Sequence, residues 1–284
     1  LDFTKKSLES YSDPDLNTLF KVFSDVNILG KNFGNDSNEL NKEFYQELLH
    51  IIGLEELKDK GKKIIYRKKE KDRDYGSLLE NTIFTLEDKD YLKNVKRFNE
   101  DKAFNAGLSL CLSWINRILF LKLLESQLIS YHSNSQDYRF LNNNFIKGFD
   151  DLNDLFFSAL AKKADERHPK FKDKYKYIPY LNSSLFEKND LESDTFDISA
   201  LNDESIEIYK GTILKEPNGK KLKGQLSTLN YLFKFLDAFD FATDGTEAIS
   251  DYDENKTLIS ASILGKIFEK LNGYKDGSFY TPSQ

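Results

Sequence analysis

The chain has 284 residues, of which 39% are hydrophobic, and its 47 acidic residues outnumber its 41 basic ones for a net charge of −6. This length and composition suffice for a large independent core. The acidic balance argues against a protein that coats DNA uniformly, although it allows a local basic face. The single cysteine, Cys111, excludes an internal disulfide and is typical of a reducing cytoplasm. We expect a cytoplasmic protein without a membrane partner, because we find neither a secretory leader nor a long uncharged apolar run.

The chain begins at Leu1 and contains no methionine. We interpret it as a piece of a longer protein, or as a sequence from which modified methionines are missing. In the second case some spacings are short by one residue, so local motifs carry more weight than long periodicities.

Helical periodicity runs through most of the chain. Apolar residues at helical spacing predict helices over 13–29, 36–54, 77–86, 103–131, 149–164, 226–241 and 258–274. Asp36 and Glu39 are spaced as a capping box for the second helix, and Gly53 suits its end. The 103–131 segment is the strongest helix, and its charged residues predict a buried central helix rather than a membrane span.

Strand signals are few. The segment 62–68 predicts a short strand in a basic loop, and 204–214 is the best candidate for a β-hairpin. The segment 167–187 is irregular, with Pro169 and Pro179 bracketing a basic stretch. We therefore predict a mainly α fold with a minor β-hairpin element. The predicted division is 1–165, a first helical part; 166–257, an irregular, β-containing segment with a helix; and 258–284, a final helix with the residues after it.

Histidine and cysteine patterns do not favour catalysis or zinc binding. His50 lies on an apolar helix face, His132 ends a helix and His168 precedes Pro169. No serine or cysteine stands in a G-x-S-x-G elbow, and one cysteine with three scattered histidines has no zinc spacing. We predict that these histidines pack or cap helices.

A magnesium nuclease of the restriction type requires an acidic residue followed by an acidic-x-Lys segment on adjacent strands. Asp197 with Glu207 and Lys210 comes nearest, but Glu207 and Lys210 are one residue too far apart. Ordinary charged strand residues explain this segment better. If it were a nuclease, the chain would cleave plasmid with a metal and lose that activity on Glu207→Ala.

Two basic stretches contain aromatic residues, 58–73 and 162–177. Such stretches can contact phosphates and raise affinity for DNA in a salt-dependent way, and the alternative is a solvated loop. The candidate DNA contacts are Arg67, Lys68, Lys69, Lys71, Arg73, Lys170, Lys172 and Lys174.

Four segments together resemble one protein family: 16–34, 116–125, "IPYLNSSLFE" at 178–187 and "ILGKIFEKLNGYKDGSFYTP" at 263–282. They are similar to the middle of type IIG restriction–modification polypeptides, in which an endonuclease and an adenine-N6 DNA methyltransferase share one chain. A helical connector separates the two enzymes in that family. The last segment is the specific one, and Ser183-Ser184 stand where the family tends to have two glycines.

The resemblance implies roles for the final motif. Phe279, Tyr280, Thr281 and Pro282 match the motif that opens the methyltransferase and forms part of its S-adenosylmethionine pocket. The alternative is that this turn merely ends a helix. The chain has neither F-x-G-x-G nor N/D-P-P-Y/F, which adenine methylation requires.

The resemblance therefore implies a helical spacer that is not catalytic alone, with S-adenosylmethionine and Mg²⁺ acting elsewhere in the parent enzyme and no cofactor in this chain. Its expected partners are double-stranded DNA and the nuclease and methyltransferase domains of the same polypeptide. The alternative is a free-standing helical module that binds protein or nucleic acid.

Overall fold

Helices dominate the computed structural model, which describes residues 41–59, 62–98, 101–242 and 256–275. Within these residues the helices are α3 (Lys42–Ile52), α4 (Leu78–Asp88), α5 (Lys102–Tyr131), α6 (Phe149–Asp154), α7 (Pro169–Lys172), α8 (Asp190–Asp194), α9 (Thr228–Asp237) and α10 (Ala261–Lys275). A π-helical segment, Leu155–Leu160, continues α6. The predicted mainly α fold with a long central helix is confirmed.

The strands of the described residues form three small sheets of two strands each. β1 (Leu54–Asp59) and β2 (Lys62–Arg67) are antiparallel, as are β3 (Ser205–Glu207) and β4 (Gln225–Ser227). β5 (Phe239–Ala242) and β6 (Thr257–Ser260) are parallel. Because β5 follows α9 and β6 precedes α10, this last sheet joins the two C-terminal helices.

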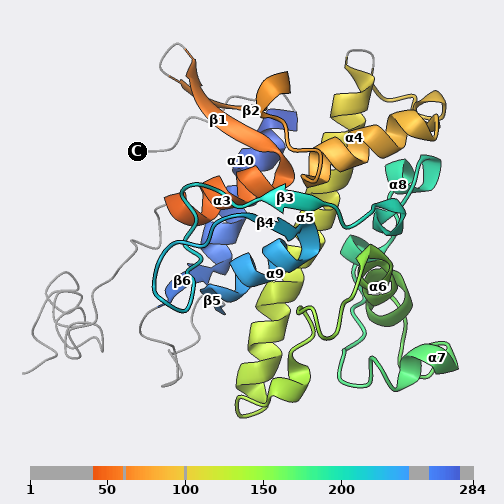
Figure 1. The fold of residues 1–284 in the computed structure, drawn as a ribbon. Coiled ribbons are helices and arrows are strands. Elements are labelled where there is room, and N and C mark those ends of the chain that lie inside the picture. The colour runs from red at the N-terminus through yellow and green to blue at the C-terminus, as the bar shows by residue number, and fades with distance from the viewer. Residues whose placement is uncertain (1–40, 60–61, 99–100, 243–255, 276–284) are drawn as a thin grey trace, which may run out of the picture. The chain divides into compact units, whose positions relative to one another are not determined.

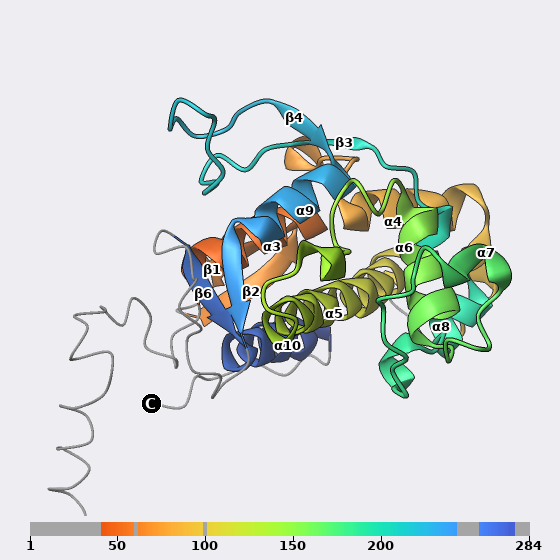
Figure 2. The same ribbon diagram turned by 90° about the horizontal axis from the view of Figure 1, so that it is seen from below.

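The 30-residue helix α5 is the centre of the fold. It contacts α4, α8, α10 and β5. In Figures 1 and 2, α3, α9 and α10 lie on one side of it, and α6, α7 and α8 lie on the other. By length and composition alone α5 could cross a membrane, but most of it is buried inside the protein, as in the core helix of a globular domain.

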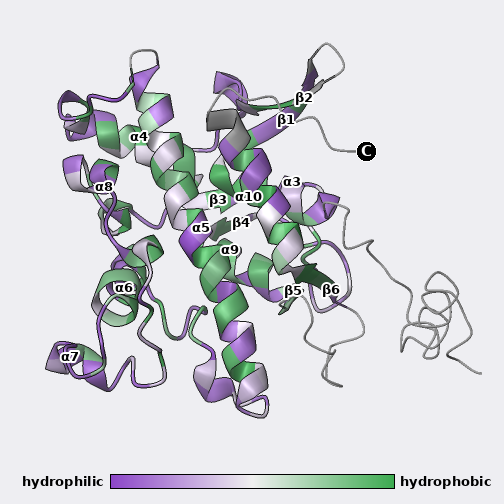
Figure 3. Cartoon of the chain, turned by 180° about the vertical axis from the view of Figure 1, so that it is seen from behind, coloured by the Kyte–Doolittle hydropathy of each residue, from purple (hydrophilic) through white to green (hydrophobic). Residues whose placement is uncertain are grey.

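Single charged residues interrupt the apolar surface of α5, and Figure 3 shows such hydrophilic positions among hydrophobic ones. Arg117 forms a buried ion pair with Glu192 of α8, at 2.7 Å between Nη2 and Oε2. Lys122 donates to Glu125 in the same helix and to Asp237 of α9. The predicted burial of these charges in a core helix is explained by their ion pairs, two of which join α5 to the distant residues Glu192 and Asp237.

A local sequence signal places the end of α3 correctly. Gly53 ends α3 with a φ of 102°, which a side chain would disfavour. The start of α3 differs from the expected helix over 36–54: it begins after Asn41, whose side chain accepts from the amide of Phe44. The proposed capping residues Asp36 and Glu39 lie outside the described residues, as does the predicted helix over 13–29.

Three secondary-structure predictions require correction. The segment 204–214 is not itself a hairpin, because β3 pairs with β4 at 225–227 and the intervening residues form a long loop. The predicted helix over 226–241 ends at Asp237, and that over 258–274 begins only at Ala261. In both cases the apolar residues at the helix end pair as β5 and β6, since a parallel partner distant in sequence satisfies their backbone groups.

Candidate functional site

One pocket among the described residues, which we call the hairpin pocket, has a volume of about 940 Å³. Its walls come from the segment after β2, from α3 and α4, and from β3 with the residues that follow it. Gly76 allows this close packing, because a Cβ there would lie 2.1 Å from the carbonyl oxygen of Ser205. The pocket brings three of the predicted DNA contacts to one place: Lys68, Lys71 and Arg73.

His50 connects three elements at the wall of this pocket. Its Nε2 donates to the backbone oxygen of Glu207 at 2.7 Å, since a carbonyl can only accept. Nδ1 of the neutral ring then accepts from the Lys68 ammonium at 2.9 Å. Burial and the neighbouring ammonium lower the pKa of His50, and burial lowers the pKa of Lys68. The ring also packs near Tyr209, so His50 has the packing role predicted for it.

Both arginines of the first basic stretch are held by one buried carboxylate. Arg67 binds Glu80 in a bidentate manner, from Nε at 2.8 Å and Nη2 at 2.7 Å, and this hydrogen bonding raises the pKa of Arg67. Arg73 approaches the same carboxylate at 3.8 Å and donates to the backbone oxygen of Lys68. These contacts fix the segment after β2 against α4.

Lys69 and Lys71 are the exposed residues among the five candidate DNA contacts of the first basic stretch. No side-chain partner occurs for either among the described residues. The hairpin pocket as a whole is not cationic, because four Lys and Arg residues face five carboxylates, those of Glu55, Asp72, Asp74, Glu204 and Glu207. Its rim also carries two exposed aromatic side chains, Tyr75 and Phe84, at 69% and 60% exposure.

The second basic stretch is organised around Arg167, which is not among the candidate DNA contacts predicted from the sequence. Arg167 is only 3% exposed and donates to the carbonyl oxygens of Ala159, Lys162, Tyr175 and Ile178. Burial lowers its pKa. A single buried guanidinium thus connects the π-helical segment to the loop after α7. The sequence does not predict this role, because Arg167 is simply one arginine in a stretch rich in lysine.

The three predicted lysine contacts of this stretch differ in their surroundings. The ammonium of Lys170 lies 5.1 Å from the centre of the Phe171 ring, and Lys172 donates to the backbone oxygen of Asp165. Lys174 forms an ion pair with Asp151 and lies 5.5 Å from the centre of the Phe145 ring. All three lysines remain candidate DNA contacts, although Lys174 already forms an ion pair with Asp151.

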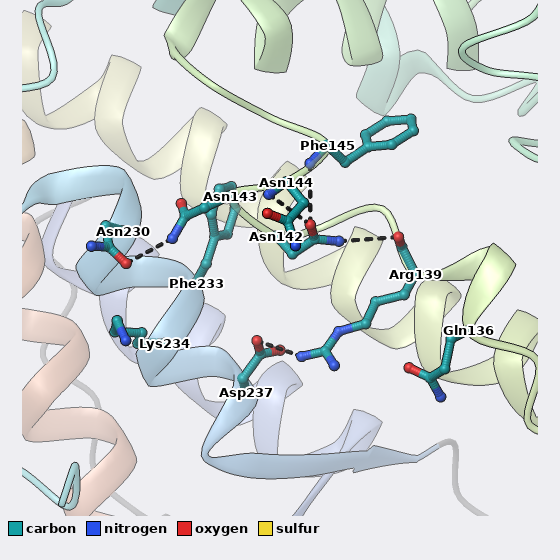
Figure 4. A pocket seen from close by; sticks show the side chains of 10 residues that line it. All are labelled: Gln136, Arg139, Asn142, Asn143, Asn144, Phe145, Asn230, Phe233, Lys234 and Asp237. Carbon is teal, nitrogen blue, oxygen red and sulfur yellow. Dashed lines mark hydrogen bonds and ion pairs between the residues drawn. The ribbon is translucent and has the colours of Figure 1, made fainter. Parts of the chain in front are cut away.

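A second pocket, of about 750 Å³, lies between α9 and the segment 136–145 (Figure 4). We call it the amide pocket because asparagines and a glutamine form much of its lining: Gln136, Asn142, Asn143, Asn144 and Asn230. Arg139, Lys234 and Asp237 also line it. The amide side chains form no distinctive sequence motif, so this pocket could not be predicted from the sequence.

The other residues considered as catalytic have structural partners. His132 ends α5 and stacks on Tyr138 with 3.8 Å between ring centres, and His168 accepts from the amide of Lys170 at the start of α7. Asp197 binds Lys188 and the amide of Ser199. Within the described residues no group of three His, Cys, Asp or Glu side chains could hold a metal.

The predicted cofactor-binding residues, Phe279 to Pro282, lie outside the described residues. Burial raises the pKa of the Cys111 thiol to about 12, and this thiol contacts Thr82 inside the core. It therefore lacks the thiolate character of a reactive cysteine.

Comparison with known proteins places the chain in a family. A family described as "Domain of unknown function (DUF7814)" matches residues 37–259. The chain belongs to this family. The match covers all of the described elements from α3 to β5 and thus both pockets.

One curated relative from Methanocaldococcus jannaschii is named "Putative type II restriction enzyme and methyltransferase RM.MjaORFECS2P". It is 27% identical over 306 aligned residues, which cover 98% of this chain and 22% of the relative. The chain thus spans about a fifth of the length of this relative and is related to a restriction–modification protein. No solved structure matches the chain.

Proposed function

We propose that the chain is the helical spacer of a restriction–modification polypeptide, between a DNA endonuclease and an adenine-N6 DNA methyltransferase. This assignment is supported by the alignment of 98% of this chain with a relative whose name gives both a restriction enzyme and a methyltransferase. The alignment covers only 22% of that relative, as expected if this chain corresponds to one part of such a polypeptide. The resemblance of 263–282 to the approach to a methyltransferase supports the order of the parts.

The proposed mechanical role rests on the contacts that anchor α5 in the fold. A spacer between two enzymes must transmit position without bending, and close-packed interiors do this because they are hardly compressible. Glu192 binds α5 at Arg117, and Asp237 binds it at Lys122. These partners lie 75 and 115 residues away in the sequence, so distant parts of the chain fix the same helix.

The test uses the full polypeptide that carries this chain. Glu192→Gln removes the carboxylate that holds α5 to α8, so the cleavage positions should spread while methylation of the recognised sequence remains. Asp90→Asn removes an exposed ion pair with Lys93 and is the control that should leave the cleavage positions unchanged. Unchanged cleavage positions in both variants would contradict the spacer role.

In this proposal the chemistry belongs to the parent polypeptide, in the cytoplasm. S-adenosylmethionine and Mg²⁺ act there, and Phe279 to Pro282 contribute one wall of the cofactor pocket. Because the motifs for the other walls are absent from this chain, it alone should show negligible affinity for S-adenosylmethionine. Micromolar binding in a calorimetric titration of this chain would contradict the proposal.

The exposed lysines next to the hairpin pocket are the proposed DNA contacts of the first basic stretch. Lys69→Ala/Lys71→Ala should reduce the slope of log affinity against log salt by about one unit for each phosphate that the protein no longer neutralises. Lys68→Ala/Lys69→Ala should reduce it less, since Lys68 is held by His50. An unchanged slope in filter-binding competition would exclude this stretch from the interface.

A free-standing binding module is the second candidate, and the exposed Tyr75 and Phe84 beside a pocket of mixed charge favour it. The coding frame beyond Gln284 distinguishes the two. F-x-G-x-G and N/D-P-P-Y/F motifs there would support the spacer, whereas a stop codon would support the module.

A further inference from the structure

We propose that the amide pocket binds a phosphate ester, with the anionic oxygens on Lys234 and Arg139 and the attached polar group on the amides of Asn143 and Asn230. This inference does not rest on the proposed function. It follows from the free hydrogen-bonding groups that α9 and the segment 136–145 present to one cavity (Figure 4).

The pocket has a fixed frame. The side-chain oxygen of Asn142 accepts from the amides of Asn144 and Phe145, and its nitrogen donates to the backbone oxygen of Arg139. Asn143 donates to Asn230 of α9 at 2.7 Å. Asn142 therefore folds the loop, and the pair of Asn143 with Asn230 clamps that loop to α9.

The helix α9 contributes a polar face to the pocket. Asn230, Lys234 and Asp237 are four and three residues apart, which places them on one side of a helix. The residues between them are buried in the core, including Tyr231, Leu232 and Phe235. The polar side chains of α9 are thus gathered where the pocket lies.

The charge that remains in the pocket is positive. Both carboxylate oxygens of Asp237 are already occupied, one by Lys122 at 2.8 Å and the other by Arg139 at 2.6 Å. Lys234 has no partner among the described residues, and Arg139 binds only Asp237 through its side chain there. Free N–H groups of an ammonium and a guanidinium in one concave site favour an anion with several acceptor oxygens, and a phosphate has this form.

The amides favour a ligand larger than inorganic phosphate. The paired amides of Asn143 and Asn230 retain a free oxygen and a free nitrogen, respectively, so they can both accept from and donate to a polar group. The volume of about 750 Å³ lies within the usual range of small-molecule sites. The lining of the hairpin pocket, by contrast, has five carboxylates and four Lys and Arg residues, so it offers a small anion no excess of positive charge.

Calorimetric titration of the chain with 5′-AMP, inorganic phosphate and a short DNA duplex tests the proposal. We expect 5′-AMP to bind more tightly than inorganic phosphate, and Lys234→Gln to weaken its binding at least about tenfold, because a charge-assisted hydrogen bond is removed. Lys89→Gln, at an exposed lysine that lines neither pocket and is not a candidate DNA contact, is the matched control and should leave the affinity for each ligand unchanged. Circular dichroism of each variant confirms that it is folded.

The outcomes decide between the sources of the phosphate. Binding of the duplex but not of 5′-AMP, with loss on Lys234→Gln, supports the site and assigns the phosphate to a nucleic-acid backbone. If none of the three ligands binds below about 1 mM, or if Lys234→Gln and Lys89→Gln have equal effects, the proposal is overturned.

Discussion

The buried ion pair between Arg117 and Glu192 gives the sharpest test of the fold. The side chains are 2% and 0% exposed, and Glu192 also accepts from the indole nitrogen of Trp114 and the amide of Asn189. Glu192→Gln preserves the shape but leaves the guanidinium without its carboxylate. Loss of one partner of a buried pair costs about 3–5 kcal/mol.

The remaining contacts indicate the lower end of that range. Arg117 also donates to the backbone oxygens of Leu185 and Glu187, and these bonds survive the substitution. We therefore expect a loss of about 3 kcal/mol in the free energy of unfolding. For a domain of this size that loss lowers Tm by roughly 6–12 °C.

Urea unfolding followed by tryptophan fluorescence is the suitable assay, because Trp114 is the only tryptophan and its indole donates directly to Glu192. The control Asp90→Asn breaks an exposed pair with Lys93 and should cost at most about 1 kcal/mol. Equal small losses in the two variants would refute the reasoning.

Three further predictions concern local features. Gly53→Ala should destabilise the protein more than Gly219→Ala, by thermal unfolding, because both have positive φ but only at Gly53 does a new Cβ meet an atom, the Ser77 hydroxyl at 2.5 Å. His50 has a lowered pKa in the fold, so its contribution to stability should decline as pH falls below the unfolded value of about 6.5; His50→Gln should remove that part of the pH dependence of the urea midpoint. Arg167→Met should cost at least about 3 kcal/mol, because the carbonyls it binds lose a charged donor, and trypsin should then cleave 162–176 faster; unchanged cleavage would contradict its anchoring role.

The sequence by itself determined the longer helices and the central position of α5, whereas the short helices α7 and α8 were not predicted. Apolar spacing identified α4, α5 and α9, and the single residue Gly53 identified the end of α3. These features are local, because a helix satisfies its backbone hydrogen bonds within its own segment. The strand β2 was also predicted, but its partner β1 was not recognised among charged residues.

Only the tertiary structure decided which charges are structural and which remain free. In the sequence, three arginines look like the neighbouring lysines of the basic stretches, such as Lys69 and Lys71. In the structure, however, Glu80 binds Arg67 and Arg73, and backbone carbonyls bind Arg167. The same holds for β5 and β6, whose apolar residues extend helical patterns in the sequence but pair in parallel across a distant connection. Contacts between residues far apart along the chain depend on how the core assembles, and a local pattern does not contain that information.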